Sequence, residues 1–289
     1  MDDPRLSIVV AGSHPAGPPT GLHDVLAPRL ADGSVELIVS TAATAASALP
    51  DHPQIRVLRH PPGTTVPRLR STGFAAGRAP LVALTEDFCV PGERWVDALV
   101  AAHTQTGAIA VGGPIDRRGG MPKDWAVTLL EYGRFFDRER RGAVDDLPGT
   151  NVCYDKARLG RCLGVVPEHW IEVAVHRFLR DRGQVLWREP EAVMFDVNDL
   201  QLTAAVRAQF HHGRLYGGMR RAESRIAERV RCVLLAPLVP AVLVRRALGN
   251  ARGRCSGAVP ALLALSAAWS FGEAIGWLAG EGHSLERWT

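Results

Sequence analysis

Cysteine is scarce in this sequence, and lysine is scarcer still. The 289 residues include five cysteines, and no two of them form a C-x-x-C pair. An odd number of scattered cysteines argues against a disulfide framework or a structural zinc site and fits a reducing compartment. Lys123 and Lys156 are the two lysines, so arginine carries nearly all of the positive charge.

A glycine-rich phosphate loop is missing from the place where a nucleotide-binding sheet would carry it. Residues 6–11 (LSIVVA) form a short, β-branched apolar run that ends at Gly12, which predicts a buried first strand. The loop after it has neither a G-x-G-x-x-G nor a Walker sequence, which disfavours dinucleotide binding and P-loop chemistry. The N-terminus is acidic and leads directly into this strand, so we expect no signal peptide and a cytoplasmic location.

Long uncharged apolar runs are also missing. The apolar segments 230–244 and 258–272 each contain about 15 uncharged residues or fewer, below the ~20 that a membrane-spanning helix needs. Pro237, Pro240 and Pro260 are expected to interrupt them. We therefore predict a helical hairpin that lies in the headgroup layer, peripheral on the inner face of the cell membrane. The alternatives are a buried helical subdomain and a homodimer interface.

Charge is distributed unevenly along the chain. Residues 203–256 contain eleven Arg and two Glu, a net of +9, so the remainder carries 4 − 9 = −5. This asymmetry suggests a polyanionic partner. Few aromatic residues are interleaved with these arginines, and no nucleic-acid motif is present, so we expect no nucleic acid and favour an anionic membrane surface.

The first two thirds of the chain alternate short apolar runs with helical patterns. Strands are expected at Leu6–Ala11, Val35–Ser40, Ile55–Leu58, Leu81–Thr85 and Ala108–Val111. Such alternation predicts an α/β fold with a mostly parallel sheet and flanking helices. We expect a first domain over residues 1–200 and an α-helical, apolar and basic tail over residues 201–289.

Two adjacent acids, Glu86 and Asp87, follow the fourth predicted strand. Open α/β sheets bind ligands at the carboxyl ends of their strands. Carboxylates there can hold a divalent cation, which in turn can neutralise a diphosphate. The alternative is a solvated loop in which Asp87 caps a turn.

Later segments are predicted with less regular structure. Residues 135–147 are highly charged and read as a mobile loop, either solvated surface or a lid over a substrate. Residues 168–183 are expected to form one helix. Residues 202–231 are expected to form one long helix or two short ones broken at Gly217-Gly218.

These stretches together resemble glycosyltransferase family 2, the inverting nucleotide-sugar enzymes with the GT-A fold. The similarity covers roughly residues 5–200 and rests on the order of the motifs. After the first strand, these are Arg70-Ser71-Thr72-Gly73 with Ala76-Gly77, Thr85-Glu86-Asp87 in place of Asp-x-Asp, Pro91 and Trp95, Gly149-Thr150-Asn151, and the acid-led helix from Glu172.

The resemblance implies a role for each matching residue. Asp87 would be the metal ligand that bridges to the donor diphosphate, with Asp196 as a second ligand. Glu172 would be the general base that deprotonates an acceptor hydroxyl; Glu168 is the alternative. The nucleotide-sugar contacts would come from Ala11, Arg70, Gly73, Glu86, Asp87 and Asn151.

The implied cofactor is Mn²⁺ or Mg²⁺, the donor a UDP-, GDP- or dTDP-sugar, and the acceptor a glycan, a lipid or a small molecule. The sequence departs from the family pattern where the second strand ends in Ser40-Thr41 instead of an acid, and where Thr85 replaces the first Asp of Asp-x-Asp. These departures keep open a second hypothesis, a catalytically inactive GT-A module that serves as a scaffold or binding partner.

Overall fold

The computed structural model describes residues 3–12, 14, 17–43, 49–222, 224–251 and 256–288. The chain divides into two compact units, and each is described by itself. The first unit contains residues 1–116 and 137–197, and the second contains residues 117–136 and 198–289. The segment 117–136 thus packs with the C-terminal helices, although it lies within the first 200 residues.

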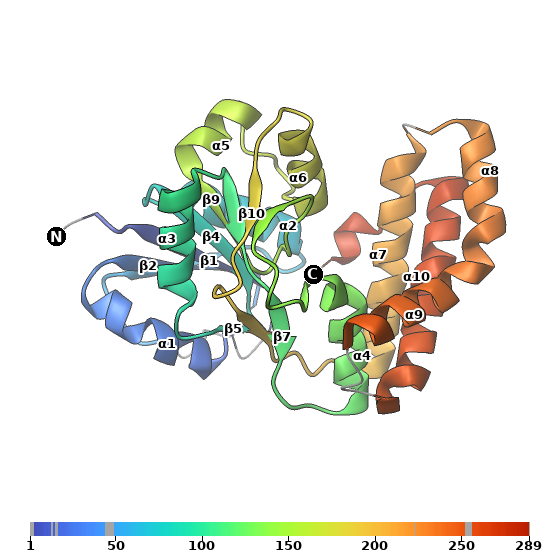
Figure 1. The fold of residues 1–289 in the computed structure, drawn as a ribbon, viewed down its shortest axis with the longest axis horizontal. Coiled ribbons are helices and arrows are strands. Elements are labelled where there is room, and N and C mark those ends of the chain that lie inside the picture. Colours follow the sequence, from blue (N-terminus) through green and yellow to red (C-terminus); the bar gives the residue numbers. More distant parts are fainter. Residues whose placement is uncertain are drawn as a thin grey trace. The chain divides into compact units, whose positions relative to one another are not determined.

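The first unit is built on two sheets. The strands are β1 (Leu6–Gly12), β2 (Val35–Thr41), β3 (Ile55–Arg59), β4 (Leu81–Glu86), β5 (Cys89–Pro91), β6 (Ala110–Gly112), β7 (Ile115–Arg117), β8 (Gly142–Val144), β9 (Val152–Asp155), β10 (Leu186–Arg188) and β11 (Met194–Asp196). The helices are α1 (Thr20–Ala31), α2 (Val66–Ala76), α3 (Trp95–Thr106), α5 (Lys156–Leu163) and α6 (Glu172–Arg180) (Figure 1).

The large sheet has eight strands in the order β3-β2-β1-β4-β9-β6-β10-β8, and the small sheet has the order β5-β11-β7. Strands β1, β2, β3 and β4 run parallel, whereas β9 is antiparallel to both β4 and β6. The chain moves outward from β1 to β3 and then returns to place β4 on the other side of β1. The order therefore reverses between β1 and β4, and open α/β sheets bind ligands outside the carboxyl ends of the strands at such a point.

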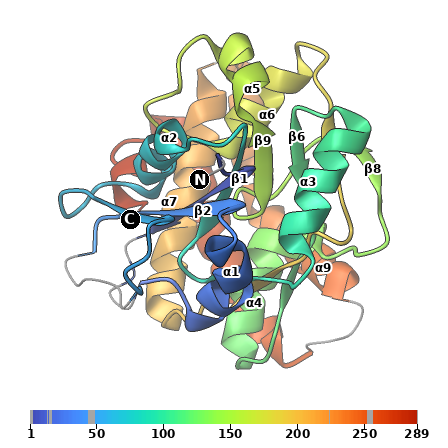
Figure 2. The ribbon, with the colours of Figure 1, turned by 90° about the vertical axis from the view of Figure 1, so that its left-hand side faces the viewer.

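Helices cover both faces of the large sheet. Val9, Ile38 and Leu84 are neighbours in register and share one buried cluster with Phe74 of α2 and with residues of α5 and α6. Alternate residues point to the opposite face, where α1 packs against β2 and α3 against β6. Figure 2 shows α1 and α3 on the side of this sheet that faces the viewer.

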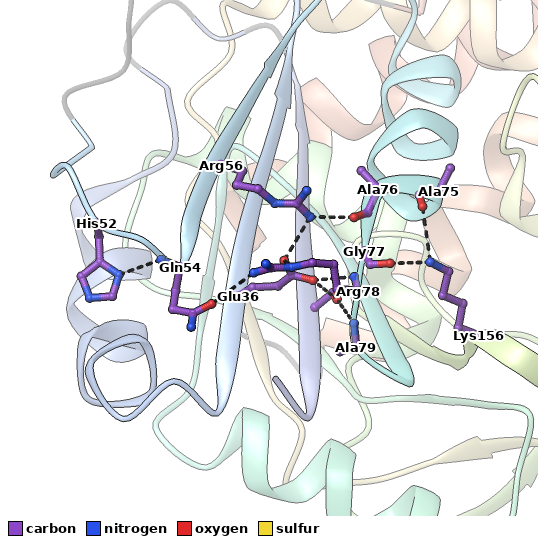
Figure 3. A network of polar contacts seen from close by, with 11 residues as sticks. Glu36, His52, Gln54, Arg56, Ala75, Ala76, Gly77, Arg78, Ala79 and Lys156 are labelled. Atoms are coloured by element: carbon purple, nitrogen blue, oxygen red, sulfur yellow. Dashed lines mark hydrogen bonds and ion pairs between the residues drawn. The ribbon is translucent and has the colours of Figure 1, made fainter. Parts of the chain in front are cut away.

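A buried carboxylate ties the sheet to α2 at the edge away from the carboxyl ends of the strands (Figure 3). Glu36, near the start of β2, is fully buried and accepts hydrogen bonds from Ser7 Oγ (2.6 Å), Arg78 N (2.6 Å) and Arg56 Nη2 (3.0 Å). Arg56 Nη2 also donates to Ala76 O at the end of α2 (2.6 Å). Burial by itself would raise the pKa of Glu36. The hydrogen bonds and the nearby arginines have the larger combined effect, so the pKa of Glu36 is lowered.

The second unit is helical. Its elements are α4 (Pro122–Tyr132), η1 (Gly133–Phe135), α7 (Leu202–Arg221), α8 (Ile226–Leu235), η2 (Ala236–Leu238), α9 (Val239–Ala251), η3 (Ser256–Ala258), α10 (Val259–Ala279) and η4 (Leu285–Arg287). Its core is formed by apolar residues of α4, α7, α9 and α10, among them Leu129, Ala205, Val244 and Leu262.

Glycines let α7 and α10 approach each other closely. A Cβ atom at Gly213 or Gly217 would overlap a backbone carbonyl of α10, and one at Gly272 or Gly276 would overlap a carbonyl of α7. Two arrangements were expected for residues 202–231, and neither is observed. A break at Gly217-Gly218 is wrong because α7 continues to Arg221, and one long helix is wrong because a separate helix, α8, begins at Ile226. The small residues serve helix packing, as in other pairs with glycine four residues apart.

Four further expectations were also wrong. Prolines do not break the tail, since α8, η2 and α9 follow one another without a non-helical residue. The apolar segments were expected to be too short to span a membrane. By length and composition alone, the helical runs Ile226–Asn250 and Val259–Ala279 are long and apolar enough to do so. The charged segment 135–147 contains a strand, β8, which pairs with β10. The helix predicted over 168–183 is shorter than expected: it begins at Glu172 and ends at Arg180.

Candidate functional site

Arg70 joins two acids that lie far apart in the sequence. Its Nη1 donates a 2.7 Å hydrogen bond to Glu172 Oε2, and its Nη2 forms an ion pair with Glu86 Oε1. The side chains of Arg70, Glu86 and Glu172 are 3%, 9% and 18% exposed. The structure thus brings three of the predicted site residues together, from α2, from the carboxyl end of β4 and from the start of α6.

The start of α6 and the loop that precedes β9 position Glu172. Glu172 is the first residue of α6, where a carboxylate interacts favourably with the helix dipole. Gly149 lies against this side chain, and a Cβ atom there would come within 2.6 Å of Glu172 Cδ. The glycine of the Gly-Thr-Asn motif therefore leaves room for the carboxylate.

Glu86 and Asp87 point in different directions, as expected of neighbours at the end of a strand. Asp87 Oδ2 accepts a 2.7 Å hydrogen bond from the backbone N–H of His14, in the loop after β1. Any Cβ atom at Gly12 would overlap the Asp87 carboxyl group. Burial raises the pKa of Asp87, and it raises the pKa of Glu86 to about 7, although the positive charge of Arg70 opposes the shift of Glu86.

Asp196 reaches the same edge from β11. It is almost fully buried and is paired in register with Cys89, and the next residue, Val197, donates a 2.9 Å backbone hydrogen bond to Phe88 O. The topology therefore places Asp196 beside the turn that follows Asp87. In the described part of the chain, no group of three or more His, Cys, Asp or Glu residues could hold a metal ion.

The chemistry of Asp87 and Asp196 nevertheless fits a hard divalent cation. Mg²⁺ is commonly held by one or two carboxylates together with phosphate oxygens of the substrate. Asp87 offers such an oxygen at the β1–β4 switch point, and its carboxyl group is only partly buried. A cation here would draw its remaining ligands from a diphosphate or from water.

Three other predicted residues have structural contacts that account for their identity. Ala11 is buried in β1, next to Glu86 in register. Gly73 lies where α2 packs on β1, because a Cβ atom there would overlap Val9. Asn151 is buried, and its amide binds Trp95 Nε1 (2.7 Å) and Ala192 O (2.7 Å). Donor contacts of these three residues stay a prediction.

The sequence reasoning missed a buried chain of side chains behind Glu172. Tyr154 Oη lies 2.8 Å from His176 Nε2, and His176 Nδ1 lies 2.5 Å from Asp146 Oδ1. His176 is one turn after Glu172 on α6, so this chain connects the helix to β9 and to the segment before Gly149. One sequence signal could have indicated this chain of side chains: Glu172 and His176 are four residues apart, a spacing that makes them neighbours on one side of a helix.

Comparison with known proteins supports the architecture. The sequence matches no protein-family profile and no curated protein. The structure is similar to mannosyltransferase PcManGT from Pyrobaculum calidifontis, in complex with GDP-Man and Mn²⁺, with a TM-score of 0.56 and 16% identity over 96% of this chain and 88% of that one. It is also similar to GalNAc-T7 with UDP, GalNAc and Mn²⁺, with a TM-score of 0.51 and 14% identity over 69% of this chain.

The chain spans 45% of the length of the GalNAc-T7 structure. At these identities the likeness concerns the fold. The mostly parallel sheet with flanking helices, followed by C-terminal helices, is therefore a GT-A-type fold.

Proposed function

We propose that this protein is an inverting glycosyltransferase of the family 2 type, which moves a sugar from a nucleoside-diphosphate sugar to an acceptor hydroxyl group. The observation that carries the proposal is the cluster of Arg70, Glu86 and Glu172, next to Asp87, at the carboxyl ends of β1 and β4. The structural neighbours that bind UDP or GDP-Man with Mn²⁺ support the same class of donor.

In the proposed reaction, Glu172 acts as the general base. The acceptor oxygen attacks the anomeric carbon from the face opposite the diphosphate and forms the new C–O bond, while the bond from the anomeric carbon to the diphosphate oxygen breaks. The hydroxyl proton passes to Glu172, and the nucleoside diphosphate leaves with the bonding electron pair. One displacement at carbon inverts its configuration.

The remaining residues would bind and orient the donor. Asp87 and Asp196 would hold a divalent cation, which supplies positive charge against the diphosphate when it is bound. Arg70 holds the Glu172 carboxyl group by a 2.7 Å hydrogen bond, so the base is oriented before an acceptor arrives. Ala11, Gly73 and Asn151 would shape the nucleotide side of the site.

We further propose that transfer takes place at an anionic membrane surface, with the enzyme peripheral on the cytoplasmic face. The support is the charge of residues 203–256, net +9, together with exposed apolar side chains on the second unit. The acceptor would then be lipid-linked or otherwise membrane-bound.

The alternative is a GT-A module without catalytic activity. It is favoured by Thr85 in place of an acid and by the lack of a three-ligand metal cluster among the described residues. Such a module would still serve as a scaffold or binding partner.

A donor screen separates the two proposals. UDP-, GDP- and dTDP-sugars are added with Mn²⁺ or Mg²⁺ while thermal unfolding is followed, and the release of nucleoside diphosphate to water is then measured. A donor at 100 times its Kd stabilises the folded state by roughly 2.7 kcal/mol. Metal-dependent stabilisation with slow donor hydrolysis supports the enzyme, whereas no response to any nucleotide sugar supports the inactive module.

A further inference from the structure

Both ring nitrogens of the buried His176 side chain have a partner. Nδ1 lies 2.5 Å from Asp146 Oδ1, and Nε2 lies 2.8 Å from Tyr154 Oη. An ionised carboxylate can only accept a hydrogen bond, so Nδ1–H donates to Asp146. In this tautomer of the neutral ring, Nε2 has a free lone pair and accepts from the Tyr154 hydroxyl group. We call Asp146, His176 and Tyr154 the His176 network.

The Tyr154 hydroxyl group is suited to donate this bond. Tyr154 is fully buried in β9, and burial raises the pKa of its hydroxyl group well above the ordinary range. The negative charges of Glu172 and Asp146 raise this pKa further. The phenol therefore keeps its proton at neutral pH. The effect of the Glu172 charge on Tyr154 also shows that the network lies within electrostatic reach of the proposed base.

The His176 network stands in surroundings that are otherwise apolar. Val175 and Leu179 are near His176 on α6, Leu147 follows Asp146, and all three belong to the buried apolar cluster under the large sheet. A buried polar group costs free energy unless it is hydrogen-bonded, and well-packed apolar side chains often replace buried charged groups without loss of stability. Buried polar networks that are satisfied hold one arrangement of the elements they join.

The Asp146 end of the network holds the segment that packs against Glu172. Asp146 stands three residues before Gly149, and both residues between them are buried. A Cβ atom at Gly149 would come within 2.6 Å of Glu172 Cδ and 2.9 Å of Glu172 Oε1, so the glycine lies directly beside the carboxyl group. The bond from His176 to Asp146 therefore fixes the position of Gly149 relative to α6.

The Tyr154 end of the network reaches the segment that leads into α6. Trp170, two residues before Glu172, is fully buried, and its ring centroid lies 5.3 Å from that of Tyr154. The Trp170 ring also lies 4.6 Å from the ring of Phe74, one turn after Arg70 on α2. Contacts of Tyr154 thus extend to the two elements that carry the Arg70–Glu172 hydrogen bond.

We propose that His176 is a positioning residue for the proposed base. Through Asp146 it holds Gly149 beside the Glu172 carboxyl group, and through Tyr154 it holds the start of α6. The carboxyl group then keeps one orientation before an acceptor arrives, which lowers the entropy cost of the reaction. This inference rests on the proposed transferase function and adds residues that act through Glu172.

The first test compares two variants of Asp146 in the full-length protein. Asp146→Ala removes the acceptor of the His176 bond, so the rate constant of sugar transfer, kcat, should fall by ~10- to 100-fold while donor affinity stays unchanged. Asp146→Asn keeps an oxygen that accepts from Nδ1–H and should restore much of kcat. Asp145→Ala is the matched control, because this neighbouring acid is 93% exposed and pairs with Arg180 at 3.2 Å. It should leave kcat unchanged.

A double-mutant cycle separates positioning of the base from support of the fold. In the Glu172→Gln background, Asp146→Ala should lower the residual transfer rate by about twofold at most, because the base it positions is already lost. An independent contribution would multiply and give a further ~10- to 100-fold loss. Tyr154→Phe removes one hydroxyl group at the other end of the network and should lower kcat in the same direction. Thermal unfolding of each variant checks that the assayed protein is folded.

Hydrogen exchange gives a readout that needs no turnover. The amide of Asn151, which donates to Pro148 O (3.0 Å), and the amide of Val175 on α6 should exchange faster in Asp146→Ala than in wild type or Asp145→Ala. Unchanged exchange would overturn the inference. So would a normal kcat in Asp146→Ala, or a fully multiplicative loss in the Glu172→Gln background.

The same measurements distinguish failure of this inference from failure of the proposed function. If the wild type turns over no nucleotide sugar, the proposed transferase is contradicted and the exchange data alone decide about the network. Faster exchange in Asp146→Ala then supports the positioning of Glu172 by His176, and unchanged exchange overturns it. If the wild type transfers sugar and the Asp146 variants behave as it does, the transferase stands and the inference falls.

Discussion

Arg70 and Glu172 are 102 residues apart in the sequence, yet Arg70 Nη1 donates a 2.7 Å hydrogen bond to Glu172 Oε2. The same guanidinium group forms an ion pair with Glu86 at the end of β4. One cation therefore fixes the first residue of α6 relative to the carboxyl edge of the sheet. This relationship gives the proposed base a defined position beside the switch point.

The first prediction concerns Glu172 as the base. Glu172→Gln keeps an oxygen that can accept from Arg70 but cannot take up a proton, so sugar transfer should fall by ~10²–10⁴-fold while donor affinity stays unchanged. Steady-state rates and donor titrations measure the two quantities. Glu168→Gln is the matched control, because Glu168 is exposed, lies outside α6 and pairs with Arg68. Near-normal turnover of Glu172→Gln would remove Glu172 from the role.

A second prediction uses the titration of Glu86. Burial raises its pKa from an ordinary value of 4.5 to about 7 in the folded protein. The folded state binds this proton more tightly than the unfolded chain, so the stabilisation is complete below about pH 4.5 and is lost as the pH rises through about 7. Glu86→Gln has no carboxyl group that could bind this proton, so its stability should lack this pH dependence.

Thermal unfolding of wild type and Glu86→Gln across this pH range provides the measurement. The Tm of the wild type should fall relative to that of the variant as the pH rises, and the difference should level off above about pH 7. Glu93→Gln, at an exposed acid, should track the wild type. Parallel curves for wild type and Glu86→Gln would show that Glu86 does not titrate in this window.

The third prediction concerns Glu36, which is remote from the site. Glu36→Gln removes the carboxylate charge that Arg56 and Arg78 bind, and both arginines are partly exposed, so we expect a loss of about 1–3 kcal/mol in unfolding free energy. Denaturant titration measures it, and donor affinity should not change. Because the pKa of Glu36 is lowered, its stabilisation is present at neutral pH and is lost as the pH falls through its folded-state value. An unchanged denaturation midpoint at pH 7 would contradict this account.

The strands of the sheet and the position of Glu86 at the end of one of them could be predicted from the sequence, because buried parallel strands have a recognisable pattern. Strands such as Leu6–Gly12 and Leu81–Glu86 are buried on both faces and read as continuous apolar runs. Their parallel pairing then brings Ala11 and Glu86 to one edge. Arg70 and Glu172 matched motif positions, but their contact depends on long-range packing that periodicity does not encode.

The helical tail was harder to predict because local rules for proline and glycine depend on context. Pro237 and Pro240 are the second residues of η2 and α9, and no non-helical residue separates these segments from α8 or from each other. Gly217 lies where α10 approaches, and its lack of a side chain serves packing. The His176–Asp146 contact was missed because Asp146 stood in a segment that read only as charged loop.

The most direct test of the central claim is calorimetric titration of nucleoside diphosphates and their sugars into wild type and Asp87→Asn, with Mn²⁺ and with a chelator. Asp87 accepts a hydrogen bond from His14 N, which the carboxamide oxygen of Asn can still accept, so the fold should survive and unfolding of the variant serves as the control. The account predicts donor binding that needs the metal in wild type and is lost in Asp87→Asn. Equal affinity in both proteins, with and without metal, would contradict it.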